Sequence, residues 1–328
     1  MKTRILFIIY FLTISSLIGY AQELKITFRV VDDFGKLVAG ASVKLFSYQA
    51  TNLKLGDGFG EDVYKETTGI TDTNGMVTLE VSSVHSDIKY GIAPYPGYYY
   101  NEPSDYQFTQ SQNGKWQPWN PVVRLVFRPI VTPVPMYAQK VKTHIAKSAQ
   151  KYGYDLVIGD WVSPTGKGQN ADLFFELTGY ANNVKDYDST LTVSFANLLD
   201  GIQPFDPITG SAFRSPREAP QGGYQNKLKL RRVRKPGQWS PDWIDDTSGE
   251  TNYFFRVRTV LDEYGKINSA LYGKIYGGFK FFGASTNGSF LSIPAYYLNP
   301  ESNSRNMEFD SRRNLIKPQR SQNQVNAP

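Results

Sequence analysis

The densest group of charged side chains in the sequence is KLKLRRVRK, residues 227–235. Six of its nine residues are basic and none is acidic: Lys227, Lys229, Arg231, Arg232, Arg234 and Lys235. Such a group attracts anionic polymers, for example a glycan that carries phosphate or uronate groups. The alternative is a strand with a basic solvent face, in which Leu228 and Leu230 point inward and the lysines discourage edge-to-edge aggregation.

Aromatic side chains form the second candidate binding set. They gather in three proline-containing segments, YPGYYY (95–100), WQPW (116–119) and WSPDW (239–243). A flat apolar ring with a polar tip suits stacking on a sugar, and loops commonly carry binding residues. The candidate sugar-contacting residues are Tyr98, Tyr99, Tyr100, Trp116, Trp119, Trp239 and Trp243. The alternative is that these rings anchor irregular loops to the core.

The sequence shows no recognisable catalytic or metal-binding pattern. There is no cysteine, and the two histidines, His85 and His144, are far apart and belong to no H-E-x-x-H motif. There is no G-x-S-x-G elbow, and TGKGQN lacks the spacing of a phosphate loop. The segment Asp72-Thr73-Asn74-Gly75 lacks the spaced oxygen ligands of a calcium loop. We therefore expect no enzyme, no cofactor and no metal.

One enzymatic alternative stays open, a glycan-active hydrolase with its site in the C-terminal part of the chain. Such enzymes use two carboxylates whose separation is set by folding, so the pair leaves no local trace in the sequence. The carboxylates that could serve are Glu176, Asp160 and Asp246.

The first 21 residues have the pattern of a secretory signal. Lys2 and Arg4 precede an apolar stretch, and Gly19-Tyr20-Ala21 supplies small residues for cleavage after Ala21. The apolar stretch is shorter than the roughly 20 residues of a membrane span. Cleavage would lower the formal net charge from +6 to +4. We expect an exported protein, periplasmic, cell-surface or extracellular, with no transmembrane span after cleavage and no nucleic acid as partner.

Composition and patterning favour an all-β protein. Aromatic residues make up 14% of the chain, Tyr is abundant, and Gly and Pro are frequent, which is typical of strands joined by turns. In LKITFRVVDDFGKLVAGASVKL, Ile26, Phe28 and Val30 alternate with other residues and Val43 and Leu45 do so again, which predicts two strands. Asn74-Gly75 precedes a further strand, MVTLEV, and predicts a type I′ hairpin turn.

The segments VVDDFGKLVAGASVKL and GITDTNGMVTLEV resemble the carboxypeptidase regulatory-like family. The resemblance covers about residues 24–129, and the segment 47–68 is longer than in the compact pattern of the family. It implies a transthyretin-like β-sandwich of about seven strands, which serves as an accessory module without catalysis.

A proline-rich connector, 130–137, is predicted to lead into a second domain, because proline favours extended chain. From 138 to 316, short β-patterned runs such as STLTVSFANLL and NYFFRVRTVL are bounded by turn residues. This spacing predicts a second, larger β-sandwich or jelly-roll. The blocks TGKGQNADLFFEL and YYLNPESNSRNMEFDSRRNL also resemble a set of exported bacterial proteins, which implies a shared domain.

The complete prediction is therefore an all-β chain with five parts. They are a signal peptide (1–21), a carboxypeptidase regulatory-like sandwich (22–129), a linker (130–137), a second β-sandwich (138–316) and a disordered polar tail (317–328). The predicted function is non-catalytic binding or a structural role at the cell envelope or outside it. The expected partner is an envelope or extracellular polysaccharide, or a surface protein.

Overall fold

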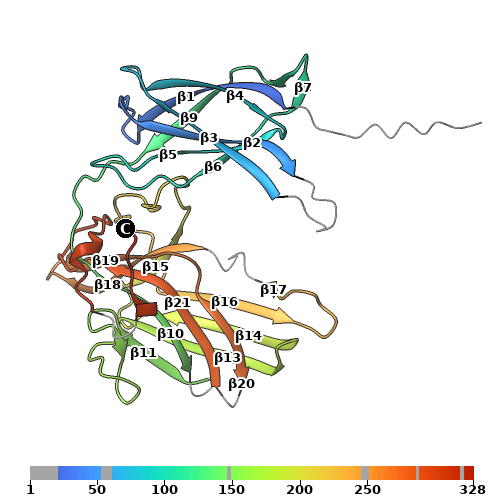
Figure 1. Ribbon diagram of the computed structural model, residues 1–328. Coiled ribbons are helices and arrows are strands. Elements are labelled where there is room, and N and C mark those ends of the chain that lie inside the picture. Colours follow the sequence, from blue (N-terminus) through green and yellow to red (C-terminus); the bar gives the residue numbers. More distant parts are fainter. Residues whose placement is uncertain (1–20, 53–60, 146–148, 245–250, 286–287, 318–320) are drawn as a thin grey trace, which may run out of the picture. The chain divides into compact units, whose positions relative to one another are not determined.

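The computed structural model describes residues 21–52, 61–145, 149–244, 251–285, 288–317 and 321–328 (Figure 1). They fall into two compact units. The first contains Met1–Tyr95 and Asn101–Phe127, and the second contains Pro96–Tyr100 and Arg128–Pro328. The predicted signal peptide lies outside the described residues except for its last position. Within the described ranges, no helix is long and apolar enough to span a membrane.

The first unit consists of two sheets. One has the strand order β4-β1-β8-β7, with β9 paired to β1, and the other has the order β3-β2-β5-β6. The strands are β1 (Gln22–Asp32), β2 (Ser42–Asn52), β3 (Glu61–Ile70), β4 (Met76–Ser83), β5 (Asp87–Ile92), β6 (Ser104–Gln107), β7 (Gln110–Gln112), β8 (Lys115–Gln117) and β9 (Val122–Phe127).

Alternating apolar residues build the core of this unit, as the sequence predicts. Ile26, Phe28 and Val30 of β1 are completely buried, and so are Val43 and Leu45 of β2. The Phe28 ring lies 5.1 Å from that of Tyr90 in the other sheet. Every second side chain of a strand therefore faces the opposite sheet.

The turn before β4 differs from the predicted type I′ hairpin, because β3 and β4 belong to different sheets and do not pair with each other. A type I′ turn needs a positive φ at both Asn74 and Gly75. Of these two residues only Gly75 has one, +68°. The Asp72 carboxylate accepts hydrogen bonds from the N–H groups of Asn74 and Met76, both 2.8 Å long. This side-chain contact favours a turn that ends in a left-handed glycine. Positive φ at two consecutive turn residues occurs instead at Asn113-Gly114, between β7 and β8.

The second unit contains two six-stranded sheets, so the all-β prediction is confirmed. Their orders are β10-β21-β19-β18-β15, with β20 paired to β21, and β12-β11-β13-β14-β16-β17. The strands are β10 (Tyr137–Ile145), β11 (Lys151–Asp155), β12 (Asp160–Trp161), β13 (Leu173–Asn183), β14 (Asp186–Ser194), β15 (Gly201–Phe205), β16 (Lys227–Arg234), β17 (Asp242–Trp243), β18 (Asn252–Leu261), β19 (Ile267–Ile275), β20 (Lys280–Ser285) and β21 (Gly288–Leu298).

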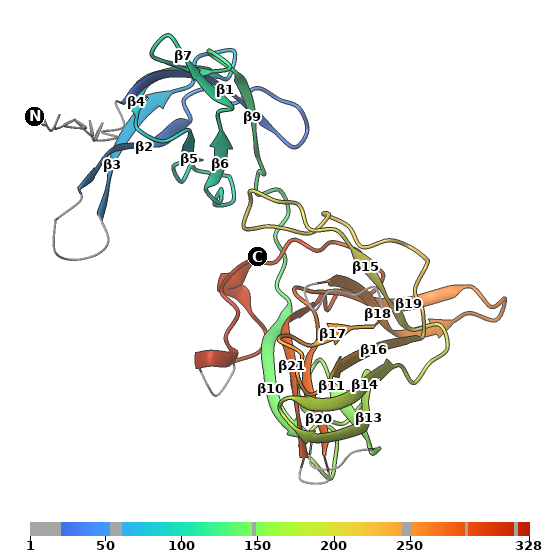
Figure 2. The same ribbon diagram turned by 90° about the vertical axis from the view of Figure 1, so that its right-hand side faces the viewer.

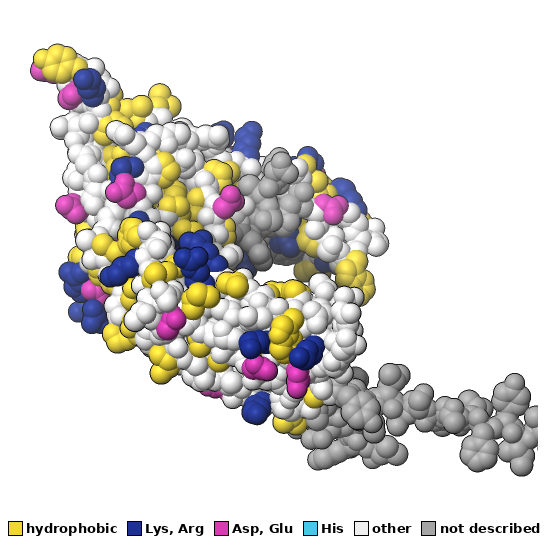
Figure 3. Space-filling model, turned by 90° about the horizontal axis from the view of Figure 1, so that it is seen from above, with side chains coloured by type: hydrophobic (Ala, Val, Ile, Leu, Met, Phe, Trp, Pro, Cys, Tyr) yellow, Lys and Arg dark blue, Asp and Glu magenta, His cyan; other side chains and the backbone are white. Residues whose placement is uncertain are grey.

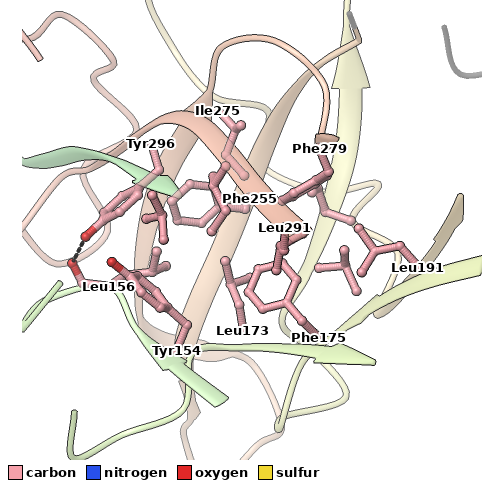
Figure 4. Packing of buried hydrophobic residues seen from close by; sticks show 14 of the residues in the cluster. Tyr154, Leu156, Leu173, Phe175, Leu191, Phe255, Ile275, Phe279, Leu291 and Tyr296 are labelled. Carbon is pink, nitrogen blue, oxygen red and sulfur yellow. Dashed lines mark hydrogen bonds between the residues drawn. The ribbon is translucent and has the colours of Figure 1, made fainter. Parts of the chain in front are cut away.

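A large apolar core lies between these two sheets (Figure 4). Phe175 and Leu191 come from one sheet, and Phe255 and Leu291 come from the other. At one end of the core the Tyr296 hydroxyl donates a hydrogen bond of 3.0 Å to the Leu156 carbonyl. The predicted inward positions of the second domain are therefore buried as expected.

The β10–β21 sheet is covered on its other face as well. Two further apolar clusters lie there, around Tyr297 with Phe309 and around Phe254 with Met307. The covering residues come from 206–226, 299–317 and 321–328, which lie outside the strands and include the short 3-10 helices η1 (Ser311–Arg313) and η2 (Ser321–Asn323). Because both faces of this sheet are buried, β18 shows an almost unbroken run of buried residues instead of alternation.

The C-terminal tail differs from the predicted disorder. Val325 has only 3% of its surface exposed and packs in the Tyr297 cluster, and the Tyr297 hydroxyl donates to the Ala327 carbonyl. The prediction rested on a polar composition, and it overlooked that one apolar side chain can hold a short segment against an open sheet face.

The predicted linker is also packed within the second unit. Met136 is completely buried, and Val134 pairs with Phe309 and donates its N–H to the Glu308 carbonyl. The prolines keep this segment extended, and an extended segment can pair with a neighbouring one. Residues 130–137 therefore do not form a free connector.

Deleting residues 321–328 should destabilise the second unit. Removal of Val325 exposes its apolar site, which predicts a loss of about 1.5–3 kcal/mol in the free energy of unfolding. Urea denaturation of residues 22–328 and of the shortened chain measures this difference. Gln324→Ala, an exposed position in the same segment, is the control and should be neutral. Equal midpoints for the full and shortened chains would contradict the role of the tail.

Candidate binding surface and buried charge clusters

The basic segment forms β16, and its side chains divide between the two faces of the sheet. Leu230 is buried and Leu228 packs against the core, whereas Lys227, Lys229 and Arg231 are exposed. This alternation agrees with the predicted inward leucines. It places three of the six cations on the outward face of the β12–β17 sheet.

The strand register places hydroxyl side chains beside these cations. Lys227 lies opposite Ser194, Lys229 opposite Thr192 and Arg231 opposite Thr190. On the next strand, Glu176 lies opposite Thr192 and Thr178 opposite Thr190. Paired residues of neighbouring strands share a face, so cations and hydroxyls form a regular array, which we call the outer sheet face.

Two cations of the basic segment already bind other side chains. Arg231 donates two hydrogen bonds, of 2.9 and 2.7 Å, to the Asp188 carboxylate, and these bonds lower the pKa of Asp188. Lys235 donates to the Tyr180 hydroxyl at 2.5 Å, which raises the pKa of Lys235. Lys227 and Lys229 have no acidic partner within 4 Å in the part of the chain that the structure describes.

The two remaining cations of the segment bind backbone carbonyls. Arg232 donates to the carbonyl of Phe281 in the other sheet, and Arg234 donates to the carbonyls of Val184 and Trp239. These side chains hold neighbouring segments in place. The six predicted binding cations therefore do not form one patch.

The predicted tyrosines have different environments. Tyr99 is buried and donates a hydrogen bond of 2.9 Å to the Glu308 carboxylate, and burial raises its pKa. Tyr98 is half-buried and Tyr100 is exposed. Tyr99 is therefore placed as an anchor of its loop, as the alternative interpretation expects.

The predicted tryptophans are spread over both units. Trp116 is half-buried and donates its ring N–H to the Ser83 carbonyl at 3.0 Å. Trp119 is also half-buried, with the Lys115 ammonium 4.5 Å from its ring centroid. Trp239 is 97% exposed. The side chain of Trp243 lies outside the described residues, although its backbone pairs with Arg232.

A buried ion cluster lies at one end of the second unit. Arg258 donates two hydrogen bonds, of 2.7 and 2.9 Å, to Asp172 and a third, of 3.0 Å, to Asp155. The Arg258 backbone has a φ of +56° and lies in an irregular stretch of the β18–β19 ladder. Its N–H donates to Asp200 at 2.9 Å. The cluster thus joins three segments that are far apart in sequence.

Burial and hydrogen bonding act in opposite directions on these carboxylates. Burial raises the pKa of Asp172, although Arg258 opposes the shift. Burial also acts to raise the pKa of Asp155, but backbone N–H groups, including those of Asn170 and Ile158, bind this carboxylate and hold its pKa below the ordinary value. The two carboxylates share one arginine, so they are not free to act as a catalytic acid and base.

A second buried cluster surrounds Lys274, which projects from β19 into the covered face of its sheet. Its ammonium group is fully buried and lies 2.8 Å from the Met307 carbonyl and 3.0 Å from the Tyr276 hydroxyl. The rings of Phe213, Tyr276 and Tyr297 lie 4.5–4.7 Å from it. Burial lowers the pKa of Lys274 well below its ordinary value.

The Glu308 carboxylate, whose charge acts on Lys274, also has several hydrogen-bond donors. Glu308 is buried and accepts hydrogen bonds from Tyr99, from the Val131 and Thr132 N–H groups, and from Arg217. Four donors on one carboxylate indicate that its role is to hold segments together.

The carboxylates named for a hydrolase do not converge. Glu176 lies on the outer sheet face, opposite Lys151, whereas Asp160 accepts hydrogen bonds from the Trp161 and Lys167 N–H groups of its own loop. Asp246 lies outside the described residues. No group of three or more His, Asp or Glu side chains among the described residues could hold a metal ion.

Comparisons with known proteins give no family. No family model matches the chain, and no curated protein matches it. A streptococcal ancillary pilin is 13% identical over 70% of this chain and 60% of its own, with a TM-score of 0.22. This chain thus spans less than two thirds of that protein.

Two further solved structures are pilins as well. The shaft pilin SpaA of Lactobacillus rhamnosus GG is 15% identical over 56% of this chain and 90% of its own, with a TM-score of 0.21. The major pilin subunit BcpA of Bacillus cereus is 12% identical over 83% of this chain and 95% of its own, with a TM-score of 0.22. Scores of this size carry no inference about the present chain.

Neither buried cluster was predicted from the sequence. Arg258 is separated from Asp172 by 86 positions and from Asp155 by 103, so no local pattern joins them. Lys274 had a weak signal, because Tyr272 and Tyr276 flank it at two-residue spacing. In a strand, that spacing puts the three side chains on one face.

Proposed function

We propose that this chain is an exported, non-catalytic binding protein that contacts an anionic envelope polymer through the outer sheet face. The observation that carries the proposal is the pair Lys227 and Lys229. Both ammonium groups are exposed on a sheet whose opposite face is packed in a core. Two exposed cations in fixed positions suit a ligand with regularly spaced negative groups.

Five buried or hydrogen-bonded charged groups of the second unit support a non-catalytic role. Asp155 and Asp172 share Arg258, Glu308 has four donors, and Lys274 is fully buried. A catalytic acid, base or nucleophile must reach a substrate. In this unit these groups instead stabilise loops and the covered sheet face.

We also propose that the first unit is a carboxypeptidase regulatory-like module and that the chain is exported through its predicted signal peptide. The two packed sheets of the first unit and the Asp72 turn support the first proposal. Secretion of the full-length chain with loss of residues 1–21, measured by mass spectrometry of the mature protein, tests the second.

The double variant Lys227→Gln/Lys229→Gln should weaken binding to an anionic polymer. With the chain 22–328, we expect a roughly 3- to 30-fold weaker affinity for polygalacturonate, because each exposed charge contributes about 0.3–1 kcal/mol. The wild type should also lose most of its binding when the salt concentration reaches 0.5 M, where the screening length is about 4 Å. Biolayer interferometry on immobilised polymer measures both effects.

The matched control removes two lysines from the first unit, Lys65→Gln/Lys89→Gln. Both are exposed and lie on strands, so this variant has the same net charge as the test variant. Equal losses for the two variants would show that net charge alone governs binding, and retention at high salt would point to ring stacking. Either outcome would refute the outer sheet face as the binding site.

A further inference from the structure

Three turns of the chain have the same construction. They begin at Asp32, Asp72 and Asp262, and each has glycine three residues later. In the third, the Asp262 carboxylate accepts hydrogen bonds from the N–H groups of Tyr264 and Lys266, and Gly265 has a φ of +77°. The two corresponding bonds form at Asp32 and at Asp72. These bonds make each turn locally rigid.

The Asp262 turn joins β18 and β19 and carries an unusual number of exposed apolar side chains. Tyr264 is 79% exposed, and Leu261 and Ile267, which pair across the hairpin, are 43% and 38% exposed. Figure 2 shows that this hairpin extends beyond the rest of its sheet. We call Leu261, Tyr264 and Ile267 the hairpin tip. An exposed apolar group of this kind commonly marks a contact surface.

The base of the hairpin is fixed to the second unit. The Asp200 carboxylate accepts hydrogen bonds from the Arg258 and Thr259 N–H groups, and the Asn197 side chain donates to the Thr259 carbonyl. Arg258 in turn binds Asp155 and Asp172. Because the base is held by charged and hydrogen-bonded groups, the tip is presented with little freedom, which lowers the entropic cost of a contact.

Besides Asp262, two exposed residues of opposite charge flank the hairpin tip. Glu263 and Lys266 are exposed, and neither has an ion-pair partner in the described ranges of the chain. The Asp262 carboxylate is already bound within the turn. At the projecting end in the upper left of Figure 3, hydrophobic, acidic and basic side chains lie next to one another.

We propose that the hairpin tip is a self-association surface that binds the hairpin tip of a second copy of this chain about a two-fold axis. In a two-fold contact, residue i of one copy meets residue j of the other, and j meets i. Glu263 of each copy can then pair with Lys266 of the other while Leu261, Tyr264 and Ile267 pack together. Because the Asp262 carboxylate is bound within its own turn, the apolar group with Glu263 and Lys266 is complementary to itself.

The charges of the tip favour this partner over a lipid surface. Asp262 and Glu263 outnumber Lys266 at the turn, and acidic side chains are repelled by anionic headgroups. A single hairpin buries less surface than the roughly 1,200 Å² of a stable interface. We therefore expect a weak dimer, with a dissociation constant on the order of 0.1–1 mM.

Charge reversal tests the two-fold pairing directly. Sedimentation equilibrium of the chain 22–328 should show a monomer–dimer equilibrium that Glu263→Lys and Lys266→Glu each weaken roughly fivefold or more, because each creates two like-charge contacts. The double variant Glu263→Lys/Lys266→Glu should regain the wild-type constant. An equimolar mixture of the two single variants should associate more tightly than either variant alone.

The Asp32 turn supplies a matched control. Phe34 occupies the same position in that turn as Tyr264 and is 66% exposed, so Phe34→Ala should leave the dimer unchanged while Tyr264→Ala weakens it. The proposal is overturned if the wild type is monomeric up to about 1 mM, if Phe34→Ala and Tyr264→Ala act alike, or if the double charge reversal does not restore association. Lys227→Gln/Lys229→Gln should dimerise normally, which separates this proposal from polymer binding.

Discussion

Replacing Arg258 with methionine should lower the free energy of unfolding of the chain 22–328 by about 3–5 kcal/mol, the usual cost of removing one partner from a buried ion pair. The side chains of Asp155 and Asp172 are 1% and 2% exposed. Without the guanidinium group, these carboxylates stay buried but lose the positive charge that offsets the cost of their burial. Urea denaturation followed by tryptophan fluorescence measures the loss.

The two carboxylates should not contribute equally to this loss. Asp155 keeps four backbone N–H donors, from Val157, Ile158, Gln169 and Asn170. Among the described residues, Asp172 keeps one donor, the N–H of Leu156. Adding Asp172→Asn to Arg258→Met should therefore recover about 1–2 kcal/mol, because a neutral amide is less costly to bury than an unpaired charge.

Two controls separate the ion cluster from other effects of the substitution. Arg312, whose side chain is 89% exposed beside Asp310, should tolerate replacement by methionine with almost no change. Arg258→Gly should be less harmful than Arg258→Ala by about 1 kcal/mol, because the left-handed backbone favours glycine. A loss below about 1 kcal/mol for Arg258→Met would contradict a stabilising ion cluster.

Replacing Lys274 with methionine should change how the stability of the protein depends on pH. Burial lowers the pKa of Lys274 in the folded protein, whereas the unfolded chain keeps a pKa of about 10.4. Between these two values the unfolded state binds more protons than the folded state. The stability of the wild type therefore rises with pH through this window, by up to about 1.4 kcal/mol per pH unit from this group.

The methionine variant lacks this contribution. The unfolding free energy of the wild type should therefore increase relative to that of the variant as pH rises from about 7 to about 10. Urea denaturation at several pH values across this range measures this difference. The contributions of other titrating groups are the same in both proteins and largely cancel. Lys280→Met, at an exposed position of β20, should give a constant difference. Parallel curves for the wild type and Lys274→Met would show that the buried amine titrates normally.

Several features of the fold followed from the sequence because they depend on neighbouring residues. Alternation predicts which side chains of β1 and β14 face the core, and it correctly placed Leu228 and Leu230 inward. The turn at Asp72 was predicted, but its type was wrong, because the carboxylate of the first residue binds the turn N–H groups. The same Asp-x-x-Gly spacing at 262–265 could have been found with this rule.

The candidate site was predictable only in part. The basic segment was identified, but the contacts of Arg232 and Arg234 depend on carbonyls of Phe281, Val184 and Trp239. A cation cannot be assigned as free or engaged until its neighbours in space are known. The outer sheet face thus retains fewer available cations than the run of basic letters suggests.

By itself, the sequence determined the all-β architecture, since side-chain alternation and turn formation are governed by residues a few positions apart. Tertiary structure alone decided which charged groups find partners: Arg258 pairs with Asp155 and Asp172, and the Tyr99 hydroxyl donates to Glu308 across 209 positions. It also decided that Val325 is buried. The physical reason is that ion pairing and burial depend on which residues lie close in space. Residues that are far apart in the sequence become neighbours only when the sheets pack.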